Sequence, residues 1–228
     1  MKFERSELDA ATAIVRRHVP PTPQYSWPLL DEVVGSSVIV KHENHTPVGA
    51  FKVRGGLVYM NRLVRQRPDV RGVVSATRGN HGQSLAFAGR QAGRSVTIFV
   101  PHGNSVEKNA AMRALGAEVI EAGDDFQEAR ERSLEFAAEH DLEPVPPFHR
   151  DLVLGVATAS LELFEGAGPL DAGIRRLREV PKRSLPGDRA FAQIDCVQRT
   201  PRRRNGGIAV FILETIVAGR SKPWRIVK

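Results

Sequence analysis

The segment GVVSATRGNHGQSLAFAGRQAGRSVTIFV, residues 72–100, predicts the fold class because its pattern indicates a strand, a loop, a helix and a second strand in succession. Residues 72–75 and 95–100 are rich in valine and isoleucine, which is typical of buried strands. Residues 80–91 follow a glycine-framed loop and are predicted to form a helix. Two strands joined by a helix of this length form a βαβ unit, which predicts a parallel sheet.

The same alternation continues on both sides of this stretch. Further helices are predicted over residues 5–17, 50–64, 105–115, 124–140 and 152–165, and further strands over residues 37–41, 117–121 and 208–217. We therefore predict an α/β fold built from parallel twisted sheets with flanking helices.

Two motifs follow strands of this pattern, GAFKVRGG at residues 49–56 and TRGNHGQ at residues 77–83. Ligands bind at the carboxyl ends of strands in open α/β sheets, so both motifs are candidate parts of an active site. Phe51 can desolvate the Lys52 amine, which favours the neutral form that makes a Schiff base with a carbonyl compound. The glycine pair at residues 55–56 suits close approach of a flat ligand. The alternative for Lys52, usual for a lysine near a helix start, is a solvated charge.

The second motif offers hydrogen-bond donors near the start of a helix. Thr77 supplies a hydroxyl, Asn80 an amide and His81 an imidazole, and backbone N–H groups add to them. Such a loop can bind a carboxylate or a phosphate. The alternative is an ordinary glycine turn in which Asn80 caps the helix.

Composition indicates a globular protein of one large domain or two small ones, with 228 residues. No run of about 18 apolar residues predicts a membrane helix, and the N-terminus lacks the apolar core of a signal peptide, so we expect a cytoplasmic location. Cys196 is the single cysteine, which excludes an internal disulfide. No metal site is expected, because His42 and His45 lack a third ligand. Glu107 and Lys108 are interpreted as an exposed charge pair.

The net charge of +7 arises at the end of the chain. Residues 1–165 carry 19 lysines and arginines against 21 aspartates and glutamates, whereas residues 166–228 carry 14 against 5. Four arginines lie within residues 199–204, so nucleic-acid binding through this tail is a rival hypothesis. This hypothesis is the less favoured one, because the tail has few aromatic residues among its basic ones to stack on bases and no recognisable nucleic-acid-binding motif.

Together the motifs resemble the fold-type II pyridoxal-phosphate enzymes, in particular the threonine/serine dehydratase and serine racemase branch. The resemblance rests on the two motifs in this order and at this interval. It also rests on VKHEN at residues 40–44, FVP at 99–101 with Lys108 and Arg113, GAEV at 116–119 and GVAT at 155–158. It covers roughly residues 15–165. It implies a two-domain architecture like that of the tryptophan synthase β chain, with residues 1–68 opening a large domain, 69–150 forming a small domain and 151–165 returning to the large one.

The resemblance also implies roles for single residues. Lys52 would be the Schiff-base lysine and the base that removes the substrate's α-proton, with Phe51 packed beside pyridoxal 5′-phosphate. Asn80 would hydrogen-bond the 3-hydroxyl oxygen of the cofactor, and Thr77, Asn80 and His81 would hold the substrate carboxylate. The implied reaction is α,β-elimination from L-threonine or L-serine, which gives a 2-oxo acid and ammonia.

Arg78 departs from the resemblance, because related enzymes usually have a small residue at this position, a serine in the racemases. Racemisation needs a proton donor on the second face of the substrate, and arginine is a poor acid or base. A dehydratase is therefore favoured over a racemase. Arg78 could instead pair with a second carboxylate, which makes 3-hydroxyaspartate an alternative substrate.

The end of the chain departs further from the resemblance. The family grips the cofactor phosphate with a second glycine-rich loop after a buried strand, and residues 166–204 offer neither. We therefore interpret residues 166–228 as an atypical basic tail from a truncated or out-of-frame gene, and the large domain as incomplete. Weak or no activity is expected of the chain as it stands, because cofactor binding loses charge-assisted contacts. A non-catalytic fragment that pairs with a full-length relative is the remaining alternative, and a homodimer is a candidate assembly.

Overall fold

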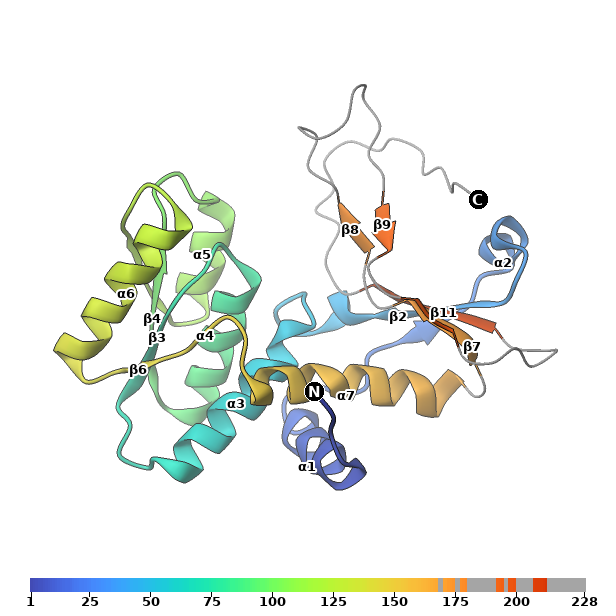
Figure 1. Cartoon of the computed structure of the whole chain (residues 1–228), viewed down its shortest axis with the longest axis horizontal. Coiled ribbons are helices and arrows are strands. Elements are labelled where there is room, and N and C mark those ends of the chain that lie inside the picture. The colour runs from blue at the N-terminus through green and yellow to red at the C-terminus, as the bar shows by residue number, and fades with distance from the viewer. Residues whose placement is uncertain (168–169, 175–176, 180–191, 195–196, 200–206, 213–228) are drawn as a thin grey trace. The chain divides into compact units, whose positions relative to one another are not determined.

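The computed structural model describes residues 1–167, 170–174, 177–179, 192–194, 197–199 and 207–212, with side chains for residues 1–167 (Figure 1). The chain divides into two compact units. The first unit consists of Met1–Pro20 and Thr46–Ser160, and the second of Pro21–His45 and Leu161–Lys228. The division into a large and a small domain with boundaries at residues 68 and 150 stays a prediction.

The first unit is built on a four-stranded parallel sheet in the order β5–β4–β3–β6. Its strands are β3 (Gly72–Ala76), β4 (Ser95–Val100), β5 (Glu118–Glu121) and β6 (Glu143–Pro144). Its helices are α1 (Arg5–Arg16), α3 (Lys52–Gln66), α4 (Asn80–Ala92), α5 (Val106–Ala114), α6 (Phe126–His140) and the first part of α7 (Arg150–Ala167). The predicted α/β fold with a parallel sheet and flanking helices is confirmed.

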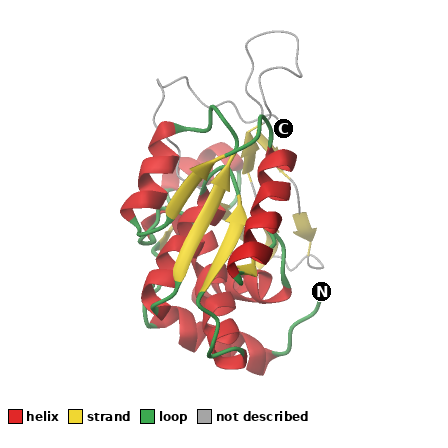
Figure 2. Cartoon of the chain, turned by 90° about the vertical axis from the view of Figure 1, so that its left-hand side faces the viewer, coloured by secondary structure: helices red, strands yellow, loops and turns green. Residues whose placement is uncertain are grey.

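Alternate residues of the central strands face two layers of helices, which flank the sheet in Figure 2. Val73 of β3 and Ile98 of β4 belong to a buried cluster with apolar residues of α1, α3, α4 and α5. Val74 and Phe99 belong to a second cluster with alanines of α6. Because side chains alternate along a strand, α6 covers one face of the sheet and α4, backed by α3 and α1, covers the other.

Parallel pairing brings the carboxyl ends of β3 and β4 to the same edge of the sheet. Ala76 pairs with Phe99, and the chain leaves β3 into α4 and leaves β4 into α5. The loop of residues 77–79 therefore adjoins the loop of residues 101–105. This is the edge at which open α/β sheets bind ligands.

The second unit contains a five-stranded sheet in the order β1–β2–β11–β7–β10. Its strands are β1 (Gln24–Tyr25), β2 (Val38–His42), β7 (Leu170–Ile174), β10 (Val197–Arg199) and β11 (Gly207–Ile212). The central three strands are parallel, and β1 and β10 are antiparallel edges. The unit also holds helix α2 (Pro28–Val34), the short helix η1 (Glu43–His45) and the antiparallel pair β8 (Leu177–Glu179) and β9 (Ala192–Ile194).

The sequence predicts a single strand after residue 165, and this prediction was wrong. Besides β11, the structure forms β7, which pairs on both sides, and the short strands β8, β9 and β10. β7 contains an aspartate and a glycine, so its local sequence is a poor strand signal. Its backbone becomes a strand because it pairs with β11, which is distant in the sequence. The nucleic-acid hypothesis rests on residues 199–204, and all of these except Arg199 lie outside the described residues.

A buried polar network supports β2 in the second unit. The Lys41 ammonium forms a 2.9 Å ion pair with the Glu162 carboxylate and donates to the Thr22 carbonyl at 3.1 Å. The Thr22 hydroxyl donates to the Glu43 carboxylate at 2.7 Å. Separating Lys41 from Glu162 would leave an uncompensated charge in the protein interior, which is unfavourable. The network therefore holds β2 against the end of α7 in one arrangement.

Among the described residues, no helix combines the length and apolar character needed to cross a bilayer. The cytoplasmic location stays a prediction.

Candidate active site

A tight turn places Lys52 at the start of α3. Gly49 adopts φ +64, a left-handed conformation that favours glycine, and its N–H donates to the Thr46 carbonyl at 2.9 Å. The Thr46 hydroxyl accepts from the Ala50 N–H at 2.9 Å, which closes the turn. Phe51 is the N-cap residue of α3 and Lys52 its first residue, both half-buried. The predicted first-turn position of Lys52 is confirmed.

Ser84 ties the start of α3 to α4. Its hydroxyl donates to the Lys52 carbonyl at 2.6 Å, and the Ser84 side chain is fully buried. The contact needs Gly56, because a Cβ at that position would lie 2.3 Å from the Ser84 hydroxyl oxygen. Ser84 is absent from the residues predicted from the sequence. Its spacing of four from Asn80, which places both on one helix face, is the signal that points to it.

The glycine pair at residues 55–56 has a different role from the one the sequence predicts. A Cβ on Gly55 would lie 2.6 Å from the Leu152 carbonyl oxygen, and Gly56 faces Ser84. Both glycines therefore let helices approach α3, so the prediction of a surface for a flat ligand is corrected.

The loop between β3 and α4 is held by backbone and hydroxyl contacts. The Thr77 N–H donates to the Phe99 carbonyl at 3.0 Å, and the Gly79 N–H donates to the Thr77 hydroxyl at 3.2 Å. Gly79 is the N-cap residue of α4 and Asn80 its first residue, with no side chain capping the helix. The alternative in which Asn80 is the cap is therefore wrong. The first N–H groups of α4 lack intrahelical acceptors and remain able to bind an anion.

His81 lies buried near Lys52. Its side chain is 6% exposed, and its Nε2 atom has no hydrogen-bond partner. Burial, followed by the positive charge of Lys52, lowers the pKa of His81 to about 4. The imidazole is therefore neutral at neutral pH.

Arg78 projects from the same loop and is exposed. None of the described side chains forms a hydrogen bond or an ion pair with its guanidinium. The structure thus brings Lys52, Thr77, Arg78, Asn80 and His81 into one region of the first unit, as the two motifs predict. Their individual roles stay predictions.

The donor set fits pyridoxal phosphate and an amino-acid carboxylate. The Asn80 amide makes no hydrogen bond to any described residue, and the buried His81 Nε2 likewise has no partner. An unsatisfied buried nitrogen such as His81 Nε2 is costly, which indicates that a ligand satisfies it, and the half-buried Asn80 amide is accessible to the same ligand. Lys52, Phe51 and Asn80 are the residues that would hold the cofactor. In the described part of the chain, no group of three acidic, histidine or cysteine side chains is placed to bind a metal ion.

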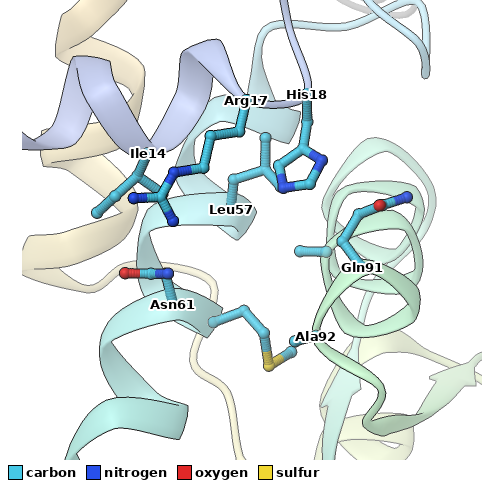
Figure 3. Close-up of a pocket in the computed structure, with 9 residues that line it drawn as sticks. Ile14, Arg17, His18, Leu57, Asn61, Gln91 and Ala92 are labelled. Atoms are coloured by element: carbon cyan, nitrogen blue, oxygen red, sulfur yellow. The ribbon is translucent and has the colours of Figure 1, made fainter.

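The first unit also contains a cavity that is separate from these residues. Its volume is about 170 Å³, and Figure 3 shows its polar rim of Arg17, His18, Asn61 and Gln91 around apolar side chains of α1, α3 and α4. None of the predicted site residues lines it.

Comparison with known proteins assigns the family. The sequence model of the pyridoxal-phosphate dependent enzyme family matches residues 15–174 of this chain. The chain belongs to this family. It is 32% identical over 166 residues to an L-threo-3-hydroxyaspartate ammonia-lyase of Saccharomyces cerevisiae, covering 72% of this chain and 50% of the relative. It is 31% identical over 151 residues to a biosynthetic L-threonine dehydratase of Haemophilus influenzae, covering 66% of this chain and 29% of the relative.

Solved structures of family members agree with this assignment. A pyridoxal 5′-phosphate-dependent aspartate racemase superposes with a TM-score of 0.72 at 29% identity, covering 76% of this chain and 55% of that one. The fold-type II assignment made from the sequence is confirmed. This pyridoxal-phosphate enzyme chain spans half or less of the length of the two relatives compared by sequence.

Proposed function

We propose that this chain carries out pyridoxal-phosphate-dependent α,β-elimination from L-threonine or L-serine, weakly as it stands, with 3-hydroxyaspartate as the alternative substrate. The observation that carries the proposal is the placement of Lys52. Its carbonyl is fixed to Ser84 of α4, and its charge acts on the buried His81 of the loop that would bind the substrate. Family membership and the names of the relatives support the reaction class.

Each side chain has a role that follows from its position. The Lys52 amine, in the first turn of α3, takes the substrate's α-proton. Thr77, Asn80 and His81, together with the first N–H groups of α4, orient the substrate carboxylate. When bound, the cofactor supplies an electron sink for the pair left by the α-proton. Departure of the β-hydroxyl as water leaves an enamine, which water hydrolyses to a 2-oxo acid and ammonia.

Elimination is favoured over racemisation by the residue between Thr77 and Gly79. Racemisation needs a group that returns a proton to the opposite face of the substrate. Arg78 keeps its proton at any working pH and cannot serve as that group. We therefore expect 2-oxo acid formation from L-serine to exceed production of D-serine.

Lysine labelling tests the proposal. The purified chain is incubated with millimolar pyridoxal phosphate, reduced with borohydride and mapped by mass spectrometry, and 2-oxo acid release from L-serine is measured in parallel. Because cofactor binding is weakened, we expect substoichiometric label at Lys52 that still exceeds the label at the exposed Lys2, and weak turnover that Lys52→Ala abolishes and the control Lys2→Ala retains. Equal labelling of Lys2 and Lys52, or turnover that persists in Lys52→Ala, would contradict the proposed function.

A further inference from the structure

Lys108 lies across the loop that precedes α4. A Cβ built on Gly79 would be 2.7 Å from Lys108 Cδ, 3.3 Å from Cε and 3.3 Å from Nζ. Gly79 has φ 168 and ψ −104, and its lack of a side chain leaves room for the Lys108 stem, which brings the ammonium to the loop.

The backbone of Lys108 is fixed by its own helix. Ser105 caps α5 and its hydroxyl accepts from the Lys108 N–H at 3.3 Å. The next residue, Asn109, is 2% exposed, accepts from the Asn104 amide at 2.6 Å and donates to the Glu121 carboxylate at 3.2 Å. Lys108 therefore extends from a rigid helix end rather than from a free loop.

α5 is also packed directly against α4. A Cβ on Gly82 would lie 2.3 Å from the Met112 sulfur, so the two helices meet closely at the first turn of α4. This contact fixes the distance between the Lys108 backbone and the Asn80 loop.

The ammonium lacks the partner that the sequence predicts. Glu107 and Lys108 are both exposed, but no ion pair joins them, and no other described residue makes an ion pair or hydrogen bond with the Lys108 ammonium. The interpretation of these residues as a charge pair is therefore corrected: consecutive helical residues point about 100° apart and do not face each other.

Two unpaired cations thus flank the same loop. Arg78 belongs to the loop and Lys108 covers it, beside N–H groups at the positive end of the α4 dipole. One α-carboxylate can be bound by the N–H groups and the polar side chains of the loop. Two further positive charges are more than that single carboxylate requires, and they suit a second anionic group.

We infer that Lys108, together with Arg78, binds the distal acid group of a dicarboxylic amino acid and so determines substrate specificity. The inference rests on the proposed function, because it places the substrate's α-carboxylate at the Asn80 loop. It assigns Lys108 a role in recognition, whereas Lys52 remains the residue that acts on the α-proton. The cofactor phosphate carries similar chemistry, so the experiment separates these two anions.

Isothermal titration of the full chain, as purified and at low salt, compares L-aspartate with L-asparagine, which differ only in the distal acid. We expect L-aspartate to bind more tightly, and Lys108→Gln to weaken L-aspartate binding about tenfold with less than a twofold change for L-asparagine. Lys108→Arg should keep most of the preference. The control Arg132→Gln removes an exposed charge from α6 and should change neither ligand.

Several outcomes would overturn the inference. They are equal affinity of the unmodified chain for the two amino acids, absence of binding of both, and equal weakening of both by Lys108→Gln. Spectroscopic titration with pyridoxal phosphate is the second arm. If Lys108→Gln weakens cofactor binding and leaves L-aspartate binding unchanged, the ammonium serves the phosphate and the inference fails. Failure of Lys52 labelling would remove the proposed function without altering the aspartate preference, so the two failures are distinguishable.

Discussion

At the scale of single residues, the environment of Lys52 is set by neighbours on α4 rather than by its own motif. The Ser84 hydroxyl donates a hydrogen bond to the Lys52 carbonyl. The positive charge of Lys52 contributes, after burial, to the lowered pKa of His81. The motif GAFKVRGG places the lysine at a helix start, but only the contact between α3 and α4 determines what that lysine faces.

Ser84→Ala tests the contribution of this hydroxyl. Removing a buried hydrogen bond to a backbone carbonyl should lower the free energy of unfolding by about 1 kcal/mol and reduce borohydride-trapped label at Lys52 several-fold. Ser133→Ala is the matched control, because the Ser133 hydroxyl is also buried and donates to the Arg130 carbonyl at 2.6 Å, within α6. We expect Ser133→Ala to lower stability and leave Lys52 labelling unchanged. The same loss of label in both variants would show that labelling follows stability alone.

At the scale of elements, α3 and α7 meet through glycines. A Cβ on Gly155 would lie 2.3 Å from the Arg54 carbonyl oxygen and 2.7 Å from the Gly55 Cα. The fully buried Arg54 guanidinium donates to the Thr158 hydroxyl at 3.2 Å, one turn further along α7. The backbone carrying Lys52 is therefore supported from α4 through Ser84 and from α7 through this crossing.

Gly155→Ala should disrupt the crossing. Alanine is the better helix former by about 1 kcal/mol, but its methyl group would meet backbone atoms that cannot move independently, at a cost of about 1–3 kcal/mol. Urea unfolding should show a net loss of stability of up to about 2 kcal/mol. Ser160→Ala, at a half-buried position of α7, should change stability by less than about 0.5 kcal/mol. A gain of stability in Gly155→Ala would mean that the helices separate without cost.

The elements that follow from local pattern are the ones the sequence predicts well. β4 coincides with its predicted bounds, and α4 differs from its prediction by a single residue, because long apolar runs and glycine boundaries are local signals. By contrast, β7 and the two-residue strand β6 form only by pairing with strands distant in the chain. Helix α2 is also not predicted from the sequence, although Pro28 at its start and Gly35 at its end are helix boundary signals. The candidate site divides in the same way. Lys52 and the Asn80 loop are visible as motifs, whereas Ser84 and Lys108 enter it only through contacts between helices.

At the scale of the whole molecule, burial of an ionisable side chain links the site to the pH dependence of folding. The pKa of His81 falls from 6.5 to about 4 on folding, chiefly because burial disfavours the imidazolium. Between these two values the unfolded chain binds a proton that the folded chain does not. Stability must therefore fall as the pH decreases from about 6.5 to about 4. Glu7, whose pKa is lowered to about 2 by its hydrogen bond with Arg150, contributes stability that is lost only as the pH falls below the ordinary glutamate pKa of 4.5.

Unfolding in urea at pH 7 and pH 5 measures this effect in the range where the His81 contribution dominates over that of Glu7. We expect His81 alone to account for a loss of about 2 kcal/mol between the two pH values. His81→Gln removes the titrating group and should reduce the pH-dependent loss by that amount, whereas His102→Gln, at an exposed position, should retain it. If His81→Gln shows the same loss as the unmodified chain, the imidazole is not held neutral by burial. The absence of a partner for Nε2 would then no longer argue for a ligand at the loop.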